Sequence, residues 1–101
     1  MTVKKEKTGD TLLISVEGAI DINTSPQLQA ELDGELDDIN LIIFDLREST
    51  YTSSSGLRVM LGTYQIMEKK GGRMILRNVN KLFYDILKMS GFTDFIEIES
   101  A

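Results

Sequence analysis

Apolar and polar residues alternate in the first part of the chain. Leu12, Ile14 and Val16 fall on one face of segment 12–17, and this period of two predicts a strand with one buried side. Segment 3–7 is polar and is followed by the turn residues Gly9-Asp10. We therefore expect segment 3–7 to be an edge strand.

Three later segments also have the character of strands. The run 41–46 is almost continuously apolar and rich in isoleucine, which is typical of a strand in the middle of a sheet covered by helices. Segment 74–76 is a short apolar run, and segment 95–99 alternates between apolar and polar residues. Residues 47–52 are polar and are expected to be a connection. The sequence therefore predicts five strands.

Helical spacing separates the later strands. Leucines recur every four residues between positions 28 and 36, which predicts a short amphipathic helix. Ser25 is the simplest N-cap for this helix, and Pro26 suits its first position. Gly34 lowers helix propensity and marks the expected end.

Two further helices are predicted downstream. The second begins at Ser54 and is closed by Gly71-Gly72, and the third is capped by Asn78 or Asn80 and ends at Gly91. Residues spaced three and four apart form the expected inward faces. These are Leu57, Met60, Leu61, Tyr64 and Met67 for the second helix, and Val79, Leu82, Phe83, Ile86 and Leu87 for the third.

The predicted order is β-β-α-β-α-β-α-β, which defines an α/β fold. Helices between strands imply parallel crossovers, so we expect a mixed, mostly parallel sheet with three helices. The chain has 101 residues, enough for one core, and we treat residues 1–101 as a single domain. So small a chain covers only one sheet face well, which favours all three helices on the same face.

Composition narrows the possible chemistry. The chain has no cysteine and no histidine, which argues against disulfides, thiolate or imidazole metal sites and a Ser-His-Asp triad. It has 11 basic and 16 acidic residues, so its net charge of −5 disfavours a nucleic-acid partner. No apolar run approaches the ~18 residues of a membrane span. We expect a cytoplasmic protein that needs no cofactor or metal ion.

Three consecutive serines precede the second predicted helix. Ser53, Ser54 and Ser55 stand between a buried strand and Gly56. One serine is enough to cap the helix. A helix N-terminus also accommodates an anion well, so a phosphoserine there is stabilised locally while it adds about −1.5 to −2 charge. Arg58, one turn further on, is a candidate partner for such a phosphate.

The chain resembles the STAS domain family (sulphate transporter and anti-sigma factor antagonist), most closely the free-standing bacterial antagonists. The resemblance rests on several segments in the right order. They are Gly18-Ala19-Ile20-Asp21 with Ser25-Pro26, the strand 41–46, Ser54-Ser55-Gly56-Leu57, Gly71-Gly72 with 74–76, Asn78-Val79, and the stretch from Leu87 to Gly91-Phe92.

The resemblance implies a specific regulatory role. Such antagonists bind a serine kinase that is also an anti-sigma factor, are inactivated when that kinase phosphorylates a serine, and are restored by a phosphatase. The acceptor here would be Ser54. The family usually has aspartate directly before the acceptor, but this chain has Ser53, which leaves Ser53 and Ser55 as alternative acceptors. The partner surface would comprise Asp21, Ser53, Ser55, Gly56, Leu57 and Arg58.

Two other functions are compatible with the same sequence. The chain could be a non-phosphorylated STAS subunit of a transporter or another signalling complex, with its serines used only for capping. An enzyme that uses Asp21 and a serine is disfavoured, because the chain offers no general base of the usual kind. Catalysis by Asp21 and Asp45 as a carboxylate pair is also disfavoured, because Asp45 at a strand end is better explained as a residue that organises the loop. We therefore expect a protein-binding module with no catalytic residues.

Overall fold

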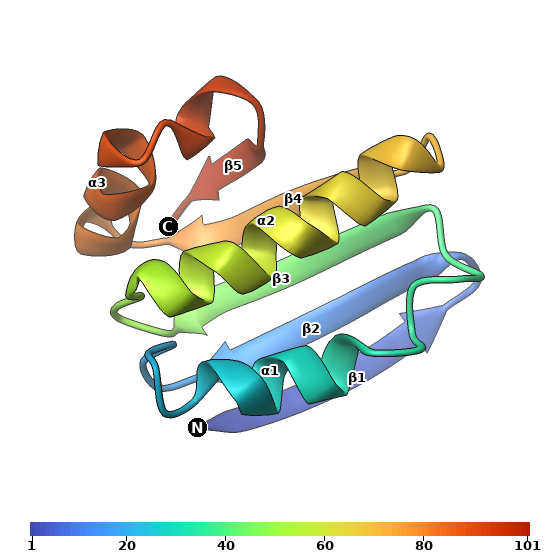
Figure 1. The fold of residues 1–101 in the computed structure, drawn as a ribbon, viewed down its shortest axis with the longest axis horizontal. Coiled ribbons are helices and arrows are strands. Elements are labelled where there is room, and N and C mark those ends of the chain that lie inside the picture. The colour runs from blue at the N-terminus through green and yellow to red at the C-terminus, as the bar shows by residue number, and fades with distance from the viewer.

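The computed structural model describes all residues 1–101 and contains the eight predicted elements in the predicted order (Figure 1). A short 3-10 helix, η1, precedes the last strand. The elements are β1 (Thr2–Thr8), β2 (Thr11–Glu17), α1 (Ser25–Leu32), β3 (Leu41–Glu48), α2 (Ser54–Lys69), β4 (Arg73–Val79), α3 (Lys81–Met89), η1 (Phe92–Asp94) and β5 (Glu97–Ser100).

The five strands lie across one sheet in chain order, β1-β2-β3-β4-β5. β1 pairs with β2 antiparallel, and every other neighbouring pair is parallel. The predicted mixed, mostly parallel sheet is therefore confirmed. Each parallel connection advances one strand in the same direction, and right-handed crossovers then place all the helices on one face. Figure 1 shows α1 and α2 side by side in front of the sheet.

The core lies between this sheet face and the helices. Phe44 on β3 has Ile14 and Leu76 as its register partners on β2 and β4, and all three side chains are fully buried. Leu28 of α1 and Phe83 of α3 belong to the same cluster of 22 buried apolar residues. Burial of each such side chain contributes about 1.5–3 kcal/mol to folding, so this one cluster holds all three helices on the sheet.

The opposite sheet face carries no helix. Ile43 and Ile75 face this side and lie outside the main cluster, yet both are buried. Charged side chains surround them: Glu97 is the register partner of Ile75 and pairs with Arg73 at 2.7 Å. The helices therefore cover one sheet face only, as expected for so small a chain, and long charged side chains shield the second face.

Several element boundaries differ from the prediction. α1 ends at Leu32, so Leu36 is buried from the following loop and not from the helix. The N-cap of α1 is Thr24, whereas Ser25 is inside the helix and its hydroxyl donates to the Asp21 carbonyl. Ser25 is not needed as the N-cap, because the turn of residues 21–24 precedes the helix and Thr24 occupies the cap position. β3 also extends through residues 47–48, which were expected in the connection.

The C-terminal part differs in a similar way. Asn80 caps α3, with its side chain accepting from Phe83 N at 2.8 Å, so Val79 remains in β4. Phe83 and Leu87 then form the inward face, and Leu82 is 56% exposed instead of buried. The final strand begins at Glu97 and not at Phe95, because η1 and the turn that follows it at Phe95 and Ile96 come first. No helix of the structure combines the length and the apolar character needed to cross a membrane.

Candidate functional site

The ends of β2 and β3 are joined beyond the sheet. Ile20 forms a parallel bridge with Thr52. Ile20 N donates to Tyr51 O at 3.0 Å, and Ser53 N donates to Ile20 O at 2.9 Å. The segment that contains Asp21 is thereby fastened to the segment that contains the serines, although more than thirty positions separate them in the chain.

Gly56 makes this junction possible. A Cβ atom at this position would lie 2.2 Å from Thr52 Oγ1 and 2.9 Å from Ile20 O. Such separations are shorter than any van der Waals contact, so the first turn of α2 can approach Ile20 only without a side chain. The glycine of the Ser-Ser-Gly-Leu motif is thus required by space and not by an unusual backbone angle.

Two more residues hold the loop between β3 and α2. The hydroxyl of Ser49 is fully buried and donates to Gly18 O at 2.8 Å. On the other side, Asn80 Nδ2 donates to Ser49 O at 3.2 Å. Sequence reasoning identified Asn80 only as a helix cap and did not identify Ser49. No local pattern indicates these bonds, because their partners are about thirty residues away.

The three serines have different environments. Ser53 is the N-cap of α2, and its Oγ accepts from Ser55 N at 3.3 Å. Ser54 is the first helical residue, is exposed, and its hydroxyl has no hydrogen-bond partner in the chain. Ser55 is half-buried. Capping therefore uses Ser53 and leaves the Ser54 hydroxyl free in solvent at the start of a sixteen-residue helix.

Asp21 organises the entry to α1. Its Oδ1 accepts from Asn23 N at 2.9 Å, from Thr24 N at 3.1 Å and from the Thr24 hydroxyl at 3.2 Å. The backbone N–H groups of Asn23 and Thr24 stabilise the carboxylate and hold the pKa of Asp21 below its ordinary value. Ile22, directly after it, is 74% exposed.

The remaining predicted site residues divide into buried and exposed positions. Gly56 and Leu57 are buried, so they position the helix and offer little contact surface. Arg58 is exposed and takes part in no ion pair. It lines an open hollow of about 310 Å³ together with Ile22, Ser25, Pro26, Gln29, Ser55 and Val59.

This end of the molecule is chemically suited to an anion on Ser54. The first turn of α2 contains no acidic residue, and its unpaired N–H groups carry partial positive charge. Arg58 adds a full positive charge one turn along. No group of three or more aspartate or glutamate side chains is placed to hold a metal ion. The arrangement therefore places an exposed hydroxyl at the start of α2, beside an open hollow that Arg58 lines.

Comparison with known proteins places the chain in a family. The family model of the STAS domain matches residues 2–101, so the chain belongs to the STAS domain family. An anti-sigma F factor antagonist from Paenibacillus polymyxa is 28% identical over 97% of this chain and 86% of its own length.

Solved structures of related fold extend this result. The anti-sigma factor antagonist SpoIIAA in its unphosphorylated form superposes with a TM-score of 0.78, at 22% identity, over 99% of this chain and 89% of that chain. The phosphorylated form of the Bacillus cell fate determinant SpoIIAA gives a TM-score of 0.76, at 23% identity, over 96% of this chain and 90% of that chain. The STAS fold is thus confirmed.

A pair of glycine substitutions on α2 tests the junction at Ile20. We expect Gly56→Ala to lower the free energy of unfolding by about 1–3 kcal/mol, because the added methyl group has no space. Gly62→Ala is the matched control: nothing lies within 4 Å of its Cβ, and we expect it to stabilise by about 0.5–1 kcal/mol. Urea unfolding measures both, and equal effects of the two substitutions would contradict the assignment.

The carboxylate of Asp21 gives a pH-dependent prediction. Because its pKa is lowered in the folded state, its stabilising contribution is present above the ordinary value of 3.8 and is lost as pH falls through the folded value. We expect Asp21→Asn to unfold at a lower urea concentration than the wild type at neutral pH. The two midpoints should converge in acid, and a difference that is constant with pH would refute this role.

Proposed function

We propose that this chain is an anti-sigma factor antagonist that binds a serine kinase acting as an anti-sigma factor, and that phosphorylation of Ser54 ends this binding. The observation that carries the proposal is the free, exposed hydroxyl of Ser54 beside a neighbour that already caps the helix. The name of the Paenibacillus relative supports the same role. The chain is then a regulatory substrate of another protein's chemistry and not itself an enzyme.

The physical basis of the switch is a change in surface charge. A phosphate adds about −1.5 to −2 charge at neutral pH and three acceptor oxygens. On Ser54 it lies at the positive end of α2, so the fold tolerates it. A partner packed closely over this surface must instead desolvate the phosphate, and that cost favours dissociation. A phosphatase that removes the phosphate restores binding.

The environments of the serines favour Ser54 as the acceptor. The Ser53 hydroxyl is engaged as the cap of α2, so its modification would compete with the Ser55 N–H. Ser55 is half-buried and lines the hollow beside Arg58. Ser53 stands where the family usually has aspartate. The uncharged Ser53 still caps the helix. The kinase must then recognise a loop with one negative charge fewer than the loop that carries aspartate at this position.

The partner surface surrounds Ser54. Asp21 and Arg58 supply charges of opposite sign near the start of α2, while Gly56 and Leu57 set the position of the first turn. Ser53 and Ser55 add polar groups to the rim. We place this interaction in the cytoplasm, where a sigma factor acts, and we assign the chain no cofactor.

Phosphate mapping is the first experiment. The protein is isolated from its native cells during growth and after stress, and the tryptic peptide Glu48 to Arg58 is sequenced by mass spectrometry. We expect phosphate on Ser54, in an amount that changes between the two conditions. Phosphate absent under both conditions would overturn the switch and favour the non-phosphorylated subunit of a transporter or other signalling complex.

Substitutions at Ser54 test the effect on binding. With the serine kinase from the same organism as the probe, we expect Ser54→Ala to bind at least as tightly as the wild type. Ser54→Asp should bind at least about tenfold more weakly, because a fixed negative charge occupies the contact surface. Gln65→Glu is the matched control, since it adds the same charge on the exposed side of α2. An unchanged affinity for Ser54→Asp would refute the proposal.

A further inference from the structure

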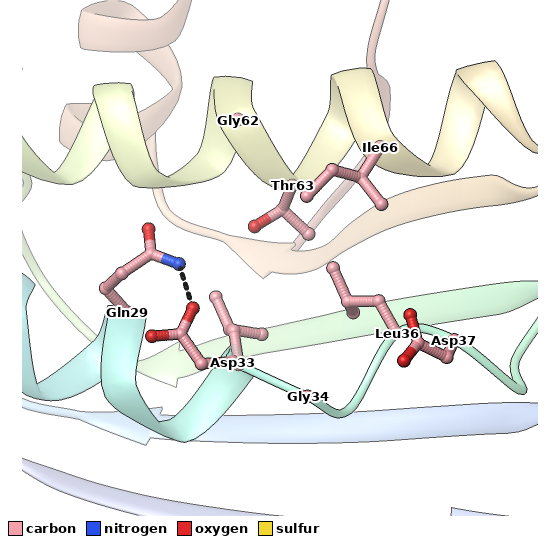
Figure 2. A pocket seen from close by; sticks show the side chains of 9 residues that line it. Gln29, Asp33, Gly34, Leu36, Asp37, Gly62, Thr63 and Ile66 are labelled. Atoms are coloured by element: carbon pink, nitrogen blue, oxygen red, sulfur yellow. Dashed lines mark hydrogen bonds between the residues drawn. The ribbon is translucent and has the colours of Figure 1, made fainter.

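A groove follows the seam between α1 and α2 well beyond the serines. The hollow beside Ser55 and Arg58 shares Gln29 with a second hollow of about 190 Å³. That one shares Leu36, Asp37 and Ile66 with a third hollow of about 370 Å³. Figure 2 shows the middle hollow, with Ile66 and Thr63 above it and Leu36 below. The three hollows therefore follow one another along the seam from Ser55 to Lys70, and we call them together the groove.

The groove exists because the two helices differ in length and because one position lacks a side chain. α1 has 8 residues and α2 has 16, so only a loop lies beside the second half of α2. Ser55, Val59, Gly62 and Ile66 line the groove with spacings of three and four residues, which is one face of a helix. A Cβ at Gly62 would meet nothing within 4 Å, so the wall of the groove is open there.

The centre of this groove exposes one large apolar side chain, that of Ile66. Ile66 is 51% exposed, although large aliphatic side chains are normally buried in a small domain. Leu32 and Leu36 line the same hollow but belong to the core and are buried, so Ile66 supplies its exposed apolar side chain. Ile22, 74% exposed, adds a second apolar contact at the end of the groove near the serines.

The groove also has a distinct pattern of charge. Asp33 and Asp37 line its middle, and neither takes part in an ion pair. Gln29 Nε2 donates to Asp33 Oδ1 at 2.9 Å, which fixes this carboxylate at the edge of the groove (Figure 2). At the far end, Lys70 Nζ donates to the carbonyl of Asp37 at 2.9 Å and so is already engaged. Lys69 and Lys70 at the far end and Arg58 near the serines therefore place positive charge at the two ends, and the middle carries the carboxylates.

We infer that this groove, defined by Gln29, Asp33, Leu36, Asp37, Gly62 and Ile66, binds an amphipathic helix of a protein partner. The helix lays an apolar stripe on Ile66, and lysine or arginine residues beside that stripe pair with Asp33 and Asp37. Charge complementarity selects this occupant: the two carboxylates have no cation of their own, and the net charge of −5 repels an acidic helix. The inference extends the proposed partner surface but does not depend on phosphorylation of Ser54.

Two designed peptides of about 16 residues test this groove, a length that matches about 24 Å of α2. Both carry leucine at helical positions i, i+3, i+4 and i+7. The lysine peptide has lysine at the positions beside the leucines, and the glutamate peptide has glutamate at the same positions. Titration into the isotope-labelled full chain is followed by NMR. We expect the lysine peptide to shift the amide signals of Gly62, Ile66 and Asp33 and to bind at least about tenfold more tightly than the glutamate peptide.

Substitutions in the groove then test whether the peptide binds there or on another surface. Gly62→Leu fills the groove and should lower the affinity for the lysine peptide at least about tenfold. Gly62→Ala is the smaller control and should retain most of this affinity. Asp33→Asn with Asp37→Asn should remove the preference for lysine, and added salt should do the same. Unfolding curves confirm that each variant is folded.

Two results would overturn the inference: equal binding of the two peptides, or signal shifts that lie outside the groove. Either result leaves the Ser54 switch untouched, since no kinase takes part in the experiment. Conversely, Ser54→Asp should leave peptide binding at Ile66 unchanged. The experiments therefore distinguish an error in the proposed function from an error in the inference that the groove binds a helix.

Discussion

The site depends on one close contact, that of the first turn of α2 with the backbone of Ile20. Gly56 allows this contact because a methyl group there would meet Thr52 and the Ile20 carbonyl. Two backbone hydrogen bonds and a parallel bridge then hold the chain after β2 against the chain after β3. Asp21 follows Ile20 directly, so the same contact places a carboxylate and a serine cluster at one end of the molecule.

Two of the serines next to this contact have different roles at the start of α2. Unpaired N–H groups need an acceptor, and Ser53 provides it. The positive end of the helix also tolerates a negative charge, and the free hydroxyl of Ser54 is the position where we propose that a phosphate is added. Because capping does not use Ser54, a phosphate there would change the surface of the molecule without removing a bond that the fold needs.

The arrangement of all helices on one sheet face shapes the remaining surface. α1 and α2 lie beside each other but differ twofold in length, so the longer helix extends past the shorter one and leaves an open seam. The uncovered sheet face is closed differently, by ion pairs such as Arg73–Glu97 over the apolar centre of the sheet. The helical side is therefore the one that offers apolar contact area to another protein.

The sequence by itself determined the order of the elements, the mixed sheet, the start of α2 and the serine motif, because strand period, helix period, caps and turns are local properties. It did not determine where α1 ends, that Leu82 faces solvent, or that Ser49 and Asn80 anchor the serine loop. These features, with the contact at Gly56 and the groove beside Gly62, were decided only by the tertiary structure. The physical reason is that each depends on which side chains from distant segments meet, and the pattern of one segment carries no information about the neighbour that packs against it.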